Sequence, residues 1–211
     1  IRRMRKLTLI KVVGFKKHLM TAISFFLPIV VAAGFLLAIG NMMGGVTIEN
    51  FKGTWTFADA MTTMGGYGLG LLPMIVSTAI AYSIADKPGI APGLIIGMVA
   101  NGTGRGFLGG IVSGYFSGVI VLLMIHYIHV PAWMQGLMPT LVIPFVSSFI
   151  AGVIMYYIVG TPIIWVTESL TNYLRGLDTN SLFLYGAIIG ILASIDYGGA
   201  INKVVFAFVF A

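Results

Sequence analysis

Long stretches without a charged side chain are the feature of this sequence that most limits its fold. A helix needs about 20 mostly apolar residues to cross the hydrocarbon core of a bilayer. The charge-free runs here do not alternate polar and apolar residues as the strands of a membrane barrel do. They predict an all-α polytopic membrane protein with about five to six transmembrane helices and one broken or re-entrant segment. The runs lie at 18–48, 60–85, 88–104, 106–167 and 179–195.

The overall composition supports a membrane protein and excludes several kinds of chemistry. Hydrophobic residues make up 58% of the chain and charged residues 9%, and the mean hydropathy is +1.02. An ordinary soluble domain is far more polar. The chain has no cysteine, so these residues cannot supply a disulfide, a thiolate nucleophile or a thiolate metal site. No nucleotide-binding or metalloenzyme motif is present, and we expect no metal and no cofactor.

The positive charges gather at the start of the chain. Seven of the twelve Lys and Arg residues fall within residues 1–17, directly before the first apolar run. Basic residues that flank a membrane span are retained in the cytoplasm, so this pattern predicts a cytoplasmic N-terminus. We interpret 1–17 as a basic leader lying on anionic headgroups. The formal charge of +6 is therefore no indication of nucleic-acid binding.

The chain divides into four predicted regions. After the leader, residues 18–160 are expected to form the main transmembrane region. Residues 161–178 place apolar side chains on one face and polar ones on the other, which predicts an amphipathic helix in the membrane interface. Residues 179–211 contain a short span and a charged segment. Since the chain starts at Ile1 and stops at Ala211 within an apolar run, we expect it to be a piece of a longer protein.

Within the main region, the first expected span covers 18–43 and contains Pro28, which would kink the helix without breaking it. Residues 44–63 are expected to form an external loop. A second span is expected at 64–85, ending in a tight turn at Asp86–Gly89.

The next segment, 90–104, is short for a crossing and ends in a glycine-rich sequence that includes Asn101 and Arg105. Short or interrupted apolar segments are typical of broken helices in transporters. If this segment crosses, Arg105 is external; if it turns back, Arg105 is cytoplasmic and every later segment inverts. Asn101 and Arg105 are weaker candidates for ligand binding.

Glycines at a spacing of four mark the following helix, at Gly106, Gly110, Gly114 and Gly118. Residues at this spacing share one face of a helix, and glycine there allows a neighbouring helix to approach closely. We therefore predict a packing face, and not a ligand site. Pairs with the same spacing occur elsewhere, at Gly66 with Gly70, Gly93 with Gly97 and Gly186 with Gly190.

The segment Asp196–Lys203 is a charged, glycine-containing octapeptide between two apolar runs. A charged side chain near the centre of a bilayer costs about 2.5–3.5 kcal/mol on insertion scales, so it normally faces a partner, a water-filled cavity or a ligand. This octapeptide is the main candidate site. The structural alternative is that Asp196 and Lys203 pair only with each other to hold a loop.

Taken in order along the whole chain, several short motifs resemble the membrane (IIC) component of the fructose branch of the bacterial phosphotransferase system, over its N-terminal two thirds. The motifs are Leu19–Pro28, Val30–Gly34, Ala85–Gly93, Gly106–Ile111, Leu141–Pro144 and Asp196–Lys203. The last differs from the usual family sequence at Tyr197 and at Ala200–Ile201, where the family has a proline.

This resemblance implies a homodimeric permease of the bacterial inner membrane. It would import a fructose-like sugar while a cytoplasmic IIB component, itself charged by IIA, donates phosphate from a phosphocysteine. Residues 18–160 would form the scaffold and dimerisation region, and 179–211 would begin the transport domain. A IIC role is consistent with the absence of cysteine.

A sugar is recognised through directional hydrogen bonds to its hydroxyl groups. Under this resemblance, 196–203 would be a hairpin in which Asp196, Asn202 and Lys203 supply a carboxylate, an amide and an ammonium group. Gly198 and Gly199 would permit a sharp turn and bring backbone amides close to the ligand. The catalytic residues are unknown and are expected beyond Ala211.

Two other classes remain open. An ion-coupled secondary transporter of a small polar solute would also have broken helices and charges at mid-membrane depth. A membrane scaffold without transport activity would explain the regularly spaced glycines but not the charged octapeptide.

Overall fold

The computed structural model describes residues 14–128, 131, 135–159 and isolated positions between 161 and 194. These residues are helical or lie in turns and loops, and none of them is in a strand. The predicted all-α fold is confirmed. In chain order the elements are α2 (Phe15–Met42), α3 (Phe57–Gly70), α4 (Leu72–Ala85), η1 (Lys87–Gly89), α5 (Ile90–Gly102), α6 (Gly106–Tyr127), η3 (Met138–Val142), α7 (Ile143–Val153) and η4 (Ile154–Val159).

Three helical stretches in the described part of the chain are long and apolar enough to cross a membrane. They are α2, α6 and the continuous stretch Met138–Val159, and the bent pair α3 and α4 would be a fourth span. Helix α5 has 13 residues and is therefore about 20 Å long, shorter than a hydrocarbon core of about 30 Å. The multi-pass membrane fold and the short segment after residue 90 are thus confirmed. The predicted span at 179–195 lies largely outside the described residues.

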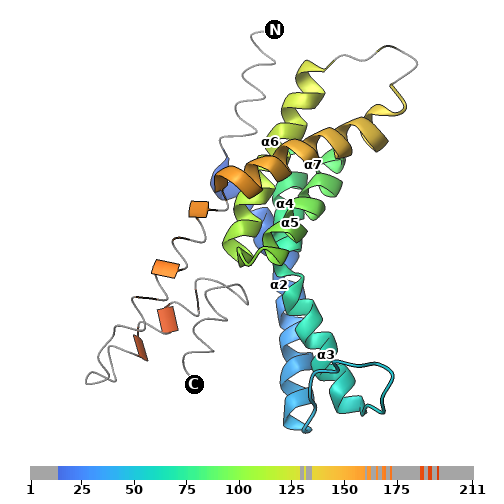
Figure 1. The fold of residues 1–211 in the computed structure, drawn as a ribbon, viewed down its shortest axis with the longest axis vertical. Coiled ribbons are helices and arrows are strands. Elements are labelled where there is room, and N and C mark those ends of the chain that lie inside the picture. Colours follow the sequence, from blue (N-terminus) through green and yellow to red (C-terminus); the bar gives the residue numbers. More distant parts are fainter. Residues whose placement is uncertain are drawn as a thin grey trace.

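Helix α2 connects two parts of the molecule (Figure 1). Its N-terminal half packs against the bundle formed by α4, α5, α6 and α7, where Ala22 and Phe26 join a buried cluster with Leu72 and Ile80. Its C-terminal half pairs with α3, and the two helices extend away from that bundle (Figure 1). The predicted first span is confirmed as Phe15–Met42 with Pro28 inside it.

The predicted external loop at 44–63 is too long, because α3 already begins at Phe57. Thr56 caps this helix: its hydroxyl accepts a hydrogen bond from the Asp59 backbone amide, and the Asp59 carboxylate accepts one from the Thr56 amide. This reciprocal arrangement satisfies two backbone donors at the helix start. Asp59 also accepts a hydrogen bond from the Val46 amide at 2.8 Å, which ties the loop back to the helix.

The expected span at 64–85 is not one straight helix. It breaks at Leu71, and α3 and α4 meet there at an angle of 41°. Pro73 sits in the first turn of α4, where its missing N–H needs no acceptor. Inside a continuous helix the same proline would remove a hydrogen bond and clash with the preceding turn. The break thus places Pro73 where a helix tolerates proline.

The packing face predicted for the glycines of α6 is confirmed at Gly110, Gly114 and Gly118. A Cβ atom added to Gly110 would lie 2.6 Å from the Pro73 carbonyl oxygen, and one added to Gly114 would lie 2.7 Å from that of Ser77. A Cβ atom added to Gly118 would lie 2.9 Å from the Ile84 Cβ. The glycines thus allow the backbones of α4 and α6 to come into contact.

The weaker glycine pairs have different outcomes. Gly93 and Gly97 of α5 also face α4. In α3, however, the prediction is wrong: nothing lies within 4 Å of a Cβ atom built on Gly66 or Gly70. The close contact between α3 and α2 is made by Gly65 and Gly68 instead, which lie against Leu37 and Ala33 of α2. The face of α3 that contacts α2 is set by the register of the two helices, which the spacing alone does not define.

Helix α7 completes the bundle by packing against α5 and α6. Ile143 lies in a buried cluster with Ala85, Val121 and Met124. At the other end of the stretch, Met155 lies with Ile96 and Ala100 of α5. The continuous stretch Met138–Val159 therefore runs antiparallel to α6, and η4 ends beside the junction of α5 and α6.

Candidate functional site

Polar side chains of the described residues gather at the junction of α5 and α6, at one end of the bundle. Helix α5 runs antiparallel to α4, so Asn101 near its end reaches the break between α3 and α4. There the Asn101 amide donates a hydrogen bond to the Gly70 carbonyl oxygen at 3.1 Å. The chain then turns through Gly104 and Gly106, whose φ angles of 74° and 54° are accessible to glycine at little cost.

Arg105 lies between these two glycines and is 6% exposed. Its Nη1 donates a hydrogen bond to the Thr103 hydroxyl at 2.9 Å. Its guanidinium carbon also lies 5.7 Å from the centre of the Tyr156 ring, within the usual range of a cation–π contact. The Nε atom is buried and has no hydrogen-bond partner. Arg105 is thus a buried cation whose hydrogen-bonding capacity is only partly used.

The position of this junction bears on the two alternatives for the segment at 90–104. The turn at Asp86–Gly89 is at one end of the bundle, and α5 runs back along α4 to the other end. Arg105 is therefore at the end opposite to Asp86. Because Asn101 meets the break inside the α3–α4 pair, α5 ends beside the middle of that pair, and both alternatives for the segment stay open.

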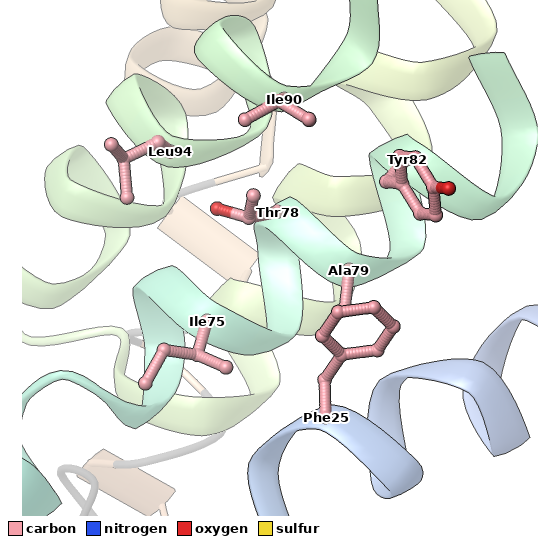
Figure 2. Close-up of a pocket in the computed structure, with 7 residues that line it drawn as sticks. All are labelled: Phe25, Ile75, Thr78, Ala79, Tyr82, Ile90 and Leu94. Atoms are coloured by element: carbon pink, nitrogen blue, oxygen red, sulfur yellow. The ribbon is translucent and has the colours of Figure 1, made fainter. Parts of the chain in front are cut away.

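An apolar hollow of about 430 Å³ lies between α2, α4 and α5 (Figure 2). Among the described residues that line it, Thr78 and Tyr82 carry hydroxyl groups. The Thr78 hydroxyl is already bonded to the Met74 carbonyl oxygen at 2.7 Å, and the Tyr82 hydroxyl points away from Thr78 and Leu94 (Figure 2). A sugar needs several convergent polar groups, so this hollow is unsuited to bind one. The other lining residues are Phe25, Ile75, Ala79, Ile90 and Leu94.

The main predicted site lies outside the described residues. This applies to Asp196, Gly198, Gly199, Asn202 and Lys203, and their proposed roles stay predictions. Of the candidate site residues, the structure describes Asn101 and Arg105. It brings them to the same junction, where their polar groups engage different partners. In the described part of the chain, no group of three or more His, Cys, Asp or Glu side chains could hold a metal ion.

Two partners at the junction were not predicted from the sequence. Tyr156 is 51 residues from Arg105 in the sequence, and no local pattern links them. The carbonyl of Gly70 becomes a partner of Asn101 at the break before α4. The one signal that could have indicated this break is Pro73, which follows a glycine-rich stretch.

The fold and the junction define a multi-pass helical membrane protein with a closely packed bundle, a bent helix pair and a buried arginine at one end. Comparison with known protein families identifies the family to which the chain belongs. Residues 20–211 match the family described as "Phosphotransferase system, EIIC". The chain belongs to this family, as the resemblance predicted.

Curated relatives agree with the family match. The chain is 44% identical over 196 residues to the fructose-specific EIIB'BC component of Escherichia coli (strain K12), covering 92% of this chain and 34% of the relative. It is 40% identical over 197 residues to the fructose-specific EIIABC component of Bacillus subtilis (strain 168), covering 92% and 31%. The 2-O-alpha-mannosyl-D-glycerate-specific EIIABC component of E. coli is 40% identical over 198 residues, covering 92% and 30%.

The chain therefore spans about a third of the length of these relatives. The comparison with solved structures gave no match.

Proposed function

We propose that this chain is part of the sugar-translocating permease subunit of a phosphoenolpyruvate-dependent phosphotransferase system. It imports a fructose-like sugar, and import is coupled to phosphorylation of the sugar by the phosphocysteine of a IIB component. The observation that carries this proposal is the family match over residues 20–211. The multi-pass helical fold supports it, as do the fructose-specific relatives.

The described helices suit the role of a scaffold. Glycine contacts between α4 and α6 and a buried hydrogen bond from Ser113 to Ser77, 2.9 Å long, make the bundle compact. Residues 18–160 thus form the scaffold and dimerisation region in this proposal. Residues 161–178 form an amphipathic helix at the membrane surface, and 179–211 begin the transport domain.

We place the sugar site at the hairpin formed by the octapeptide. Asn202 and nearby backbone groups bind sugar hydroxyls, and Asp196 orients the loop or one hydroxyl. Lys203 balances Asp196 or offsets the charge of the phosphoryl group, while Gly198 and Gly199 allow the turn. The described lining of the hollow beside α4 has two hydroxyl groups, of Thr78 and Tyr82, which is few for a sugar and supports a site elsewhere. None of these residues is proposed as the catalytic base.

The partners follow from the same reasoning. The EIIB'BC relatives join B and C parts under one name, which supports a IIB partner that is in turn charged by IIA. We further propose a homodimer in the bacterial inner membrane with a cytoplasmic N-terminus. The concentration of basic residues in 1–17 supports this orientation.

The experiment is phosphoenolpyruvate-dependent phosphorylation of labelled fructose by membranes that contain the full-length permease and its soluble partners. Asn202→Ala and Asp196→Asn should each raise the apparent KM or lower the rate by about tenfold or more, because each removes a hydrogen bond to a ligand or its loop. The matched control is Asn50→Ala, since Asn50 is an exposed residue in the loop before α3. Wild-type kinetics in both site variants, at equal membrane expression, would exclude the hairpin as the sugar site.

The comparisons do not favour the alternative of an ion-coupled secondary transporter. Uptake of free fructose driven by an ion gradient, in vesicles without a phosphoryl donor, would support the secondary transporter instead.

A further inference from the structure

The hollow of about 430 Å³ between α2, α4 and α5 opens to the outside of the bundle (Figure 2). Three of the side chains that line it keep much of their surface exposed: Phe25 by 50%, Ile90 by 42% and Leu94 by 48%. Helix α2 and the pair of α3 and α4 are apolar enough to cross a membrane. An apolar hollow that opens from such helices suits a hydrocarbon chain, because both surfaces are apolar.

The described lining makes little demand for hydrogen bonds. The Thr78 hydroxyl already donates to the Met74 carbonyl oxygen at 2.7 Å. The Tyr82 ring meets the Phe25 ring edge to face, with ring centres 6.2 Å apart, and its hydroxyl points away from Leu94 (Figure 2). A flexible acyl chain could therefore enter without leaving a polar group unpaired.

Each flank of the hollow leads to an exposed lysine. Lys17, Thr21 and Phe25 follow one another at a spacing of four, so they lie along one side of α2. On the other flank, Lys87 in η1 is one turn before Ile90, and its carbonyl oxygen accepts a hydrogen bond from the Ile90 amide. Both rows of residues thus run from an apolar lining residue to a cation.

The two lysines lie at the same end of the bundle. His18 follows Lys17 directly, and its Nδ1 lies 2.8 Å from the Oγ of Ser83, near the end of α4. Lys87 is four residues beyond Ser83. The hollow therefore has an apolar body and a pair of cations towards one end.

The charge of this end is positive. Within residues 14–128, its charged side chains are those of Lys16, Lys17, Lys87 and the carboxylate Asp86, and all four are exposed. Cations at the end of a membrane helix attract anionic lipid headgroups. A partner that complements the whole surface carries a hydrocarbon chain and, at one end, a negative charge.

We infer that this hollow binds one acyl chain of an anionic phospholipid, with Lys17 and Lys87 attracting the phosphate of its headgroup. Neutral lipids fill the hollow less well, because they lack a net charge to interact with the two lysines. The inference goes beyond the proposed sugar import, and its experiment reads binding without requiring transport or phosphorylation.

The experiment measures thermal unfolding of the full-length protein in detergent during titration with phosphatidylglycerol. Phosphatidylcholine with the same acyl chains is the neutral comparison, and glycerol phosphate supplies a charged group without chains. We expect phosphatidylglycerol to stabilise the protein with an apparent affinity about tenfold or more above that of phosphatidylcholine. Glycerol phosphate at the same concentrations should have no effect.

Two changes separate the headgroup contact from the chain contact. Lys17→Gln combined with Lys87→Gln should remove the preference for phosphatidylglycerol, while Lys16→Gln, on a neighbouring face of the same helix, should keep it. Leu94→Trp should weaken the binding of both lipids by about tenfold or more, because the larger ring occupies the hollow and excludes methylene groups. Its matched control is Leu123→Trp, at a position 43% exposed on α6 and outside the described lining.

Loss of the preference in the double lysine variant together with weaker binding in Leu94→Trp, with both controls unchanged, supports the inference. Equal stabilisation of the wild-type protein by the two lipids, or none by either, overturns it. Wild-type behaviour of the double lysine variant or of Leu94→Trp overturns it too, as does stabilisation by glycerol phosphate equal to that by phosphatidylglycerol.

Discussion

The cap of α3 shows how two residues set the start of a helix. The side chains of Thr56 and Asp59 each accept a hydrogen bond from the other's backbone amide. The Asp59 carboxylate also accepts one from the Val46 amide. Helix α3 thus starts at Phe57, inside the stretch expected to be loop. The spacing from Thr56 to Asp59 was visible in the sequence, but aspartate replaces the longer glutamate or glutamine of the usual capping pattern.

We predict that Thr56→Ala destabilises the start of α3 by about 1 kcal/mol, because an amide loses its side-chain acceptor. Hydrogen exchange of the amides between residues 45 and 62 should become faster, with the amides of α6 unaffected. Thr54→Ala removes the same kind of side chain two residues earlier in the exposed loop and should leave these rates unchanged. Equal protection in Thr56→Ala and the wild-type protein would contradict a stabilising cap.

At the scale of helices, the closest contacts depend on residues without a side chain. Gly110, Gly114 and Gly118 bring α6 onto α4, and the buried Ser77 and Ser113 hydroxyl groups form a hydrogen bond at the same crossing. A spacing of four was enough to predict this face because residues four apart lie above one another on a helix. It failed for α3, where Gly65 and Gly68 are the contact residues.

We predict that Gly114→Ala destabilises the protein by about 1–3 kcal/mol, since the added methyl group would overlap the Ser77 carbonyl. The melting temperature of the protein in detergent should fall measurably. Gly66→Ala adds the same methyl group to a helix at a position with nothing within 4 Å, and it should be neutral or slightly stabilising. If Gly114→Ala is as stable as Gly66→Ala, the contact between α4 and α6 is not as close as described.

At the scale of the whole molecule, contacts fix which ends of the helices lie together. His18 near the start of α2 lies 2.8 Å (Nδ1 to Oγ) from Ser83 near the end of α4. Phe15 stacks on Tyr115 of α6, with ring centres 4.9 Å apart. The basic start of the chain and the turn at Asp86–Gly89 are therefore at the same end, and the loop before α3 is at the far end of α2.

This arrangement predicts the labelling pattern of single cysteines placed in a cysteine-free version of the full-length protein. Lys17→Cys and Lys87→Cys should react with a membrane-impermeant thiol reagent from the cytoplasmic side. Asn50→Cys, in the exposed loop between α2 and α3, should react from the opposite side. Labelling of Lys17→Cys and Lys87→Cys from different sides would contradict the packing of α2 against α4.

The sequence by itself determined the class of protein, the start of the first span near residue 18, the short segment after residue 90 and the packing face of α6. These features depend on composition and local spacing, which act within one helix. The octapeptide at 196–203 was also identified this way, as a costly group of charges in an apolar chain, and its role stays a prediction.

Only the tertiary structure decided the bend at Leu71, the face of α3 that contacts α2 and the surroundings of Arg105. Asn101 meets Gly70, and Arg105 meets Tyr156, across separations of 31 and 51 residues. Contacts of this range depend on how whole helices are placed against one another. Local spacing constrains the face of a single helix but not its register with a neighbour, so these partners became visible only in the folded bundle.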